Sequence, residues 1–202
     1  ARKKEVKLLP PFEFYIMDAY CIKSFIESAF ELNNFLFEIL FTAAEADFNL
    51  ERYESAFEYY KEASIDCQQA GAEVECLYKM ACCKMRVYDF ITARGLLEKI
   101  SQNCQAGKIQ AACCECALLD LADLYEYHFN EIEKAVKVLI DYCSVNKQDS
   151  SSALRLASLL YETGRYNEAV IYLSGEYISG GDNRSELALL TAKCYYSLKL
   201  YS

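Results

Sequence analysis

Residues 153–176 read ALRLASLLYETGRYNEAVIYLSGE. Apolar residues recur three and four positions apart on both sides of Gly164, which predicts two amphipathic helices joined by a turn. In the second helix, Ala169 follows Tyr166 by three positions. A small side chain at Ala169 lets a partner helix approach closely, while the tyrosine fills the space beside it. The stretch therefore predicts a helical hairpin.

The same pattern occurs three more times upstream. In each copy a large apolar residue, two intervening residues and an alanine are followed four positions later by another bulky apolar residue. The four alanines stand 37, 42 and 34 residues apart, and each is preceded by a second helical stretch. These intervals have the length of a supersecondary repeat. The residues assigned to packing within the hairpins are Tyr53, Ala56, Phe90, Ala93, Ile132, Ala135, Gly164, Tyr166 and Ala169.

The composition favours an all-α chain. Of 202 residues, 53% are hydrophobic, and the 7 Gly and 2 Pro are too few for a fold of tight β-hairpins. Lys and Arg number 21 against 30 Asp and Glu, and the net charge of −9 disfavours nucleic-acid binding. No stretch approaches the roughly 18 apolar residues of a membrane span, and the N-terminal residues lead into no signal-peptide core.

The repeated hairpin resembles the tetratricopeptide repeat (TPR) family over about residues 37–202. The resemblance is best in residues 153–176, where Leu156, Leu160 and Gly164 fall at the family's offsets. No unit has the family's closing proline, and the second and third units have Tyr88 and Asn130 near the place of the inter-helix glycine. The resemblance implies an all-α fold of stacked antiparallel helical hairpins forming a right-handed TPR-like superhelix, an α-solenoid.

The resemblance also predicts how the chain is divided. Residues 1–36 are expected to form a helical cap or a degenerate repeat. About four and a half hairpins follow, over residues 37–73, 74–112, 113–149, 150–184 and a truncated 185–202. The 42-residue interval implies longer helices or an insertion. Because the last apolar helix has no partner helix, we expect the chain to be a fragment of a longer protein.

In the TPR family, the first helix of each hairpin lines a concave groove that binds a partner. Transferred residue by residue, the groove positions are Glu38, Phe41, Glu45 and Phe48; Glu75, Tyr78, Cys82 and Met85; Cys116, Leu119, Asp123 and Glu126; Ser151, Leu154, Ser158 and Tyr161; and Glu186, Leu189, Lys193 and Tyr196. This apolar, aromatic and acidic set favours a basic or amphipathic segment of another protein. The Lys, Arg and Asn side chains with which family members hold the acidic tails of chaperones are missing, so no such clamp is expected.

The sequence thus predicts a non-catalytic protein–protein interaction scaffold, part of a subunit of a larger eukaryotic assembly. It contains no phosphate-cradling glycine loop, nucleophile elbow or zinc-protease motif, and its single histidine, His128, has no orienting partner. No enzyme activity and no cofactor are expected. One alternative is a self-associating, dimeric repeat subunit of a machine such as a ubiquitin ligase or a ciliary transport complex.

The 11 cysteines leave another alternative open. They are odd in number and several are adjacent, so we interpret them as reduced core thiols of a cytoplasmic or nuclear protein. However, Cys113 and Cys116 stand one helical turn apart, and Cys82 and Cys83 lie on the preceding hairpin. This spacing is also compatible with a thiolate metal site or a redox module.

Overall fold

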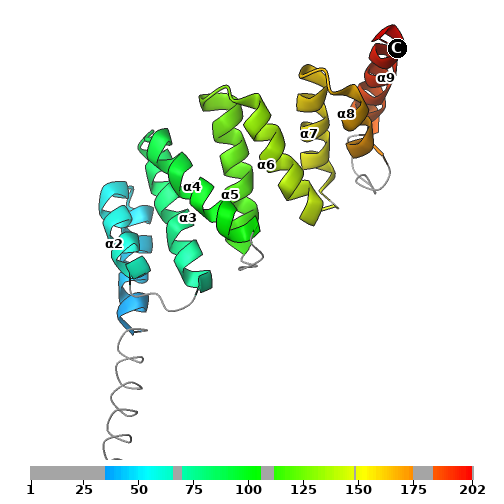
Figure 1. The fold of residues 1–202 in the computed structure, drawn as a ribbon. Coiled ribbons are helices and arrows are strands. Elements are labelled where there is room, and N and C mark those ends of the chain that lie inside the picture. The colour runs from blue at the N-terminus through cyan, green and yellow to red at the C-terminus, as the bar shows by residue number, and fades with distance from the viewer. Residues whose placement is uncertain (1–34, 66–69, 106–111, 148, 175–183, 202) are drawn as a thin grey trace, which may run out of the picture.

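The computed structural model describes residues 35–65, 70–105, 112–147, 149–174 and 184–201, and this part of the chain is helical and has no strand. A helix over residues 35–49 comes first. It is followed by α2 (Tyr53–Ile65), α3 (Ala70–Arg86), α4 (Phe90–Gln105), α5 (Ala112–Asp123) with its π-helical extension η1 (Leu124–His128), α6 (Ile132–Val145), α7 (Ser150–Glu162), α8 (Tyr166–Tyr172) and α9 (Arg184–Tyr201). In Figure 1 these helices stand side by side in a diagonal row, from the blue helix over residues 35–49 to the red α9.

The helices form an array in which each packs mainly on its neighbours in the chain. α2 packs on α3, α3 on α4, α5 on α6 and α7 on α8. We call the helix over residues 35–49, α3, α5 with η1, α7 and α9 the first helices, and α2, α4, α6 and α8 the second helices. Among first helices, α3 contacts α5 and α7 contacts α9. The predicted all-α solenoid of stacked hairpins is confirmed, while the cap expected over residues 1–36 lies, except for its last two residues, outside the described residues.

Small side chains lie where the hairpins are tightest. Ala56, Ala93, Ala135 and Ala169 have no exposed surface. Aromatic rings pack beside them across the hairpins: the ring centroids of Phe48 and Tyr53 and those of Tyr161 and Tyr166 are each 5.3 Å apart. A continuous core of buried Leu, Ile, Val and Ala side chains runs through the array.

The four turns within the hairpins share one backbone conformation. Glu51, Tyr88, Asn130 and Gly164 have φ of 60°, 61°, 53° and 78°, and each lies two residues before the second helix begins. Only one of the four is glycine, although this left-handed conformation favours glycine. The first three units therefore all lack a glycine at this turn position. The sequence had indicated the missing glycine only in the second and third units, at Tyr88 and Asn130.

Exchanging residues at these turn positions is expected to change stability in opposite directions. An alanine Cβ at Gly164 meets no atom within 4 Å, so Gly164→Ala strains only the backbone. We expect it to lower the free energy of unfolding by about 1 kcal/mol, and Glu51→Gly to raise it by a similar amount. Urea unfolding followed by circular dichroism measures both, and equal midpoints for Gly164→Ala and the wild type would contradict the turn assignment.

The first helix of the third unit ends in a π-turn, which adds one residue to the turn. The amide that closes the turn binds a carbonyl five residues earlier in the other units, as Arg165 N donates to Leu160 O at 2.8 Å. In the third unit it spans six residues, since Glu131 N donates to Tyr125 O at 2.7 Å. The second helix before it is also longer, with 16 residues in α4 against 13 in α2 and 14 in α6. A longer helix and one inserted residue thus account for part of the 42-residue interval, of which residues 106–111 lie outside the described residues.

The interpretation of all the cysteines as reduced thiols was wrong for one pair. Cys104 in the last turn of α4 and Cys114 in the first turn of α5 form a disulfide, because the packing of these helices brings their Cα atoms within 6.3 Å. The thiols of Cys83, Cys143 and Cys194 are free and buried as small apolar side chains, and Cys76 is buried as well. The cytoplasmic or nuclear location, which partly rested on reduced thiols, stays a prediction.

Asp149 begins α7 as its N-cap. Its Oδ1 accepts the amides of Ser151 and Ser152 at 3.1 and 3.3 Å, and its Oδ2 accepts the hydroxyls of Ser152 and Tyr142 at 2.7 and 3.0 Å. Burial raises the pKa of Asp149, but these hydrogen bonds outweigh burial and leave the pKa below its ordinary value.

Asp149→Ala is expected to lower the free energy of unfolding by about 1 kcal/mol at pH 7. Because the folded-state pKa is lowered, the stabilisation is complete above the unfolded pKa and is lost as the pH falls through the folded one. The difference between variant and wild type should therefore shrink below about pH 4. Urea unfolding at pH 7 and pH 3 measures it, and a difference that stays constant would exclude an ionised cap.

Candidate groove on the first helices

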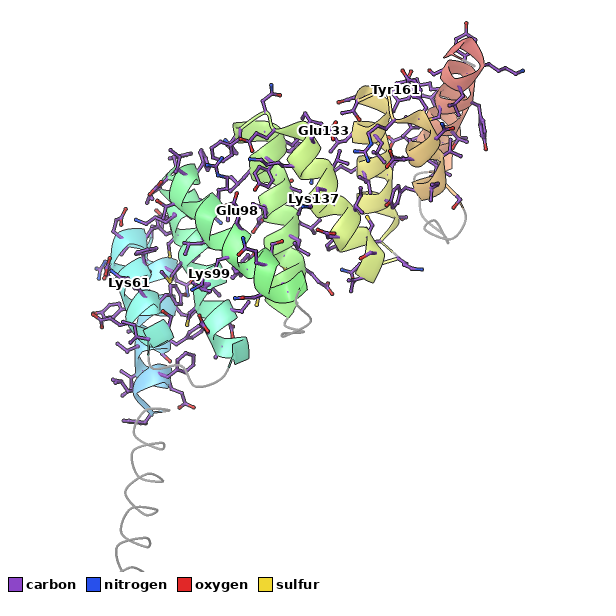
Figure 2. All side chains as sticks on the ribbon, viewed as in Figure 1. Lys61, Glu98, Lys99, Glu133, Lys137 and Tyr161 are labelled. Atoms are coloured by element: carbon purple, nitrogen blue, oxygen red, sulfur yellow. A yellow bond between two sulfur atoms is a disulfide. The ribbon has the colours of Figure 1, made fainter. Side chains whose placement is uncertain are left out.

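The predicted groove positions lie on the first helices, and their exposure differs along the array. The second position of the first four units is large, apolar and half-buried in every case: Phe41, Tyr78, Leu119 and Leu154. We call these four residues the apolar strip. Phe48, Met85, Ser158 and Tyr161 are also half-buried, whereas Glu38, Glu75, Cys116, Ser151, Glu186, Leu189, Lys193 and Tyr196 are exposed. The second helices carry charges of both signs, among them Lys61, Glu98 and Lys137, which Figure 2 labels.

Glu45 is held by an internal cation. The Lys79 Nζ on α3 lies 2.7 Å from its Oε1, and the Tyr60 hydroxyl on α2 donates to the same atom. Burial raises the pKa of Glu45, but the bonds from Lys79 and Tyr60 outweigh it and the net pKa is lowered. The carboxylate thus joins the first two hairpins and is less available to a partner than its predicted groove position implies.

Asp123 and Glu126 are held in the same way at the junction between α5 with η1 and α7. Arg155 Nη1 lies 2.6 Å from Asp123 Oδ1, while Nε and Nη2 donate to Glu126 Oε2 at 3.0 and 2.5 Å. The guanidinium is mostly buried, with 26% of the side chain exposed. Three of the six predicted groove carboxylates are therefore paired with two cations of the chain itself. Fewer carboxylates at these positions are thus available to a partner than their number in the sequence suggests.

Lys79 and Arg155 stand at equivalent places in the repeat. Each directly follows the second groove position of its unit, and each binds the carboxylate at the third groove position of the preceding unit. Sequence reasoning missed both, because it transferred only four positions per helix. The sequence does contain a signal for these pairs: a basic residue directly after the second groove position, and an acidic residue at the third groove position of the preceding unit.

The junction between α3 and α5 breaks this pattern. Asp120 stands at the place of Lys79 and Arg155, and the third position of the preceding unit is Cys82. The Tyr78 hydroxyl donates to Asp120 Oδ2 at 3.0 Å. Burial raises the pKa of Asp120, more than the bond from Tyr78 lowers it. Burial and the nearby carboxylate of Asp120 also raise the pKa of the Cys82 thiol to about 11, so the thiol stays protonated.

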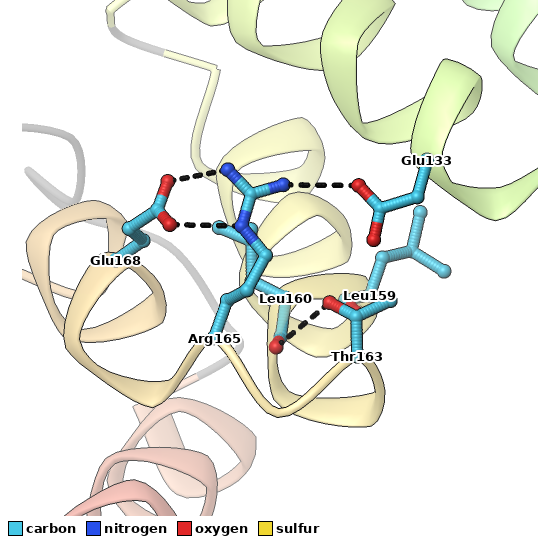
Figure 3. A network of polar contacts seen from close by, with 6 residues as sticks. All are labelled: Glu133, Leu159, Leu160, Thr163, Arg165 and Glu168. Atoms are coloured by element: carbon cyan, nitrogen blue, oxygen red, sulfur yellow. Dashed lines mark hydrogen bonds and ion pairs between the residues drawn. The ribbon is translucent and has the colours of Figure 1, made fainter.

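On the second helices, Arg165 joins the third and fourth hairpins. Its Nε and Nη2 donate to the two carboxylate oxygens of Glu168 at 2.8 and 2.6 Å, and Nη1 reaches Glu133 Oε2 at 3.3 Å (Figure 3). Thr163 donates from its hydroxyl to the carbonyls of Leu159 and Leu160 and so completes the turn before it. These contacts fix the orientation of the hairpins that present the apolar strip.

Among the described residues, neither His128 nor the cysteines form a catalytic or metal-binding cluster. His128 is exposed at the end of η1 and stacks on Phe90, with ring centroids 3.8 Å apart. Over the described ranges, no group of three or more His, Cys, Asp and Glu side chains is placed to hold a metal ion. In those ranges, no helix is both long and apolar enough for a membrane span.

Comparison with known proteins finds likeness in structure. No protein-family model and no curated protein matches the chain. A mutant of MamA is 15% identical, with 82% of this chain and 84% of that one covered and a TM-score of 0.57. MamA AMB-1 is 17% identical over 83% and 82% of the chains, with a TM-score of 0.55. Nearly identical TPR-like repeats of a putative kinesin light chain from Podosopora anserina are 16% identical over 81% and 86%, with a TM-score of 0.54.

These likenesses establish the class of fold. The chain is an all-α, TPR-like repeat superhelix, and the resemblance noted in the sequence is confirmed at the level of the fold.

Proposed function

We propose that the chain is a non-catalytic scaffold that binds an amphipathic segment of another protein along its first helices. The observation that carries the proposal is the apolar strip. Four successive first helices present a large, half-buried apolar side chain at the same repeat position. Such a row fits the apolar face of an extended or helical segment, which recognises regularly spaced anchors. The TPR-like fold supports this use of the first helices.

The charges around the strip refine the proposed partner. Glu38, Glu75 and Glu186 are exposed on three first helices and are not engaged by the internal pairs of Lys79 and Arg155. A segment with an apolar face flanked by basic residues is complementary to this surface. We further propose that the chain belongs to a larger eukaryotic assembly, in which such a segment is one of the contacts.

The test uses peptides selected on the folded chain from a random 16-residue display library. The variant Leu119→Ser/Leu154→Ser shortens the strip at two half-buried positions. We expect it to weaken the selected peptides at least about tenfold, which corresponds to about 1.4 kcal/mol of binding free energy. Ile91→Ser removes an apolar side chain of similar size, 71% exposed on the second helix α4, and is the matched control.

Fluorescence anisotropy measures the affinities, and the melting temperature of each variant shows that it remains folded. Peptides that bind the strip variant and the wild type equally would exclude the first helices as the binding surface. Loss of binding in Ile91→Ser instead would place the surface on the second helices.

A second candidate function is self-association through α9. Leu189, Tyr195 and Tyr196 leave 58%, 56% and 68% of their surface exposed on this one helix. Large apolar side chains grouped on one element are typical of interfaces between proteins. Sedimentation velocity over a range of concentrations tests it: a dimer that Leu189→Ser/Tyr196→Ser dissociates would support this function, and a monomer at every concentration would exclude it.

A further inference from the structure

The junction between α3 and α5 is the one place in the first three junctions where the repeated ion pair is replaced by a carboxylate and a thiol. In the junctions before and after it, Lys79 and Arg155 each bind a carboxylate of the preceding unit. Here the side chain at the cation's place is Asp120, and the side chain opposite is Cys82. The three pairs stand at the same positions of the repeat, and the middle pair differs in its side chains.

Asp120 has no cation of its own within the described residues. No Lys or Arg of this part of the chain forms a salt bridge with it, and its polar contact is the neutral hydroxyl of Tyr78 at 3.0 Å. The charge that acts on it is the carboxylate of Asp123, which raises its pKa further. A half-buried carboxylate in this setting has lost part of its hydration without gaining an opposite charge. A cation brought to it would therefore be stabilised.

The surroundings favour a cation on an organic side chain over a free ion. Tyr78 and Leu119 of the apolar strip flank Asp120, and they present partly exposed apolar surface. The aliphatic stem of a lysine or arginine packs on such surface while its charged head reaches a carboxylate. A divalent metal would need several oxygen or sulfur ligands, and the described side chains form no such group.

We propose that a lysine or arginine of the bound partner approaches Asp120 beside Cys82 and pairs with its carboxylate, so that this junction gains an ion pair like the two junctions that flank it. The inference rests on the proposed function, since it names the residue of the partner segment that the middle of the groove recognises. The Cys82 thiol beside Asp120 stays neutral, so it adds no charge that competes with the carboxylate for the incoming cation. The partner thus completes the series of ion pairs that the chain leaves incomplete.

The experiment is a double-mutant cycle with the peptides selected on the wild-type chain. Each basic residue of a peptide is replaced in turn by glutamine, and affinities are measured for the wild type and for Asp120→Asn, which keeps an acceptor for Tyr78. We expect one basic residue whose replacement weakens binding at least about tenfold with the wild type and less than about threefold with Asp120→Asn. Glu62→Gln on α2 changes the net charge by the same amount at an exposed position and is the control.

In a second variant, the chain itself supplies a cation for Asp120. Cys82→Lys places an ammonium group beside Asp120, so it should raise the melting temperature and weaken the same peptides to the extent that Asp120→Asn does. An affinity that Cys82→Lys leaves unchanged would overturn the inference.

The two proposals fail in different ways. Selected peptides without a basic residue, or with no basic residue coupled to Asp120, would overturn the pairing while leaving the scaffold function intact if Leu119→Ser/Leu154→Ser still weakens them. Peptides insensitive to the strip variant would overturn the scaffold function itself.

Discussion

Reduction of the disulfide between Cys104 and Cys114 is expected to lower the free energy of unfolding by about 2–3 kcal/mol. The bond closes a loop with a sequence separation of 10 residues and joins the end of α4 to the start of α5. It restricts the unfolded chain, and it links the second hairpin to the third at a point where α4 also packs on α5. Urea unfolding with and without a thiol reductant measures the effect.

The double variant Cys104→Ser/Cys114→Ser is the control for the reductant. It should unfold at the midpoint of the reduced wild type, and added reductant should not move it further. A wild-type curve that is the same in both conditions would contradict the cross-link, as would mass spectrometry that finds both thiols alkylated without prior reduction.

Ala169→Leu is expected to lower the free energy of unfolding by about 1–3 kcal/mol through overpacking. Ala169 has no exposed surface on α8, a helix of 7 residues packed against α7 and α9. The additional methyl groups have no space unless the hairpin opens. Urea unfolding measures the loss, and hydrogen exchange should quicken in α7–α9 while α2 and α3 keep their protection, because each hairpin contacts mainly its neighbours.

Ile171→Leu is the control, which tests whether the loss of stability depends on the position of the leucine in α8. Ile171 is 56% exposed on the same helix, so this change should leave the unfolding midpoint within experimental error. An unchanged midpoint for Ala169→Leu would show that the packing register of the fourth hairpin is wrong.

The sequence predicted the helices well because their signal is local. Apolar spacing indicated a first helix near residue 151 and a second near Tyr166, and the structure has α7 from Ser150 and α8 from Tyr166. The turn at Glu51 was missed because it adopts a glycine-like conformation without glycine, and no pattern of neighbouring residues indicates that. The disulfide was missed because the sequence does not show which of many cysteines come together in space.

For the candidate groove, the sequence predicted which residues share a helix face, but not which of their charges are paired within the chain. Helical spacing identifies which residues share a face, so the apolar strip follows from the repeat. Whether a carboxylate is paired with a cation depends on the neighbouring unit. Glu45 and Asp123 form ion pairs with cations on α3 and α7, whereas Asp120 accepts a hydrogen bond from the tyrosine hydroxyl of Tyr78 on α3. Those partners lie about thirty to forty residues away in the chain, and only the stacking of the hairpins brings them within hydrogen-bond distance.

The π-turn η1 shows how the array accommodates a change of length. In a chain of stacked hairpins, a misplaced residue would rotate every later unit by about 100°, the angle of one α-helical step. The extra residue is taken up within Leu124–His128, and Asn130 and Ile132 then repeat the turn and helix start of the other units. Each turn therefore resets the phase of the array, so that the length of one unit can vary while the direction of the whole is preserved.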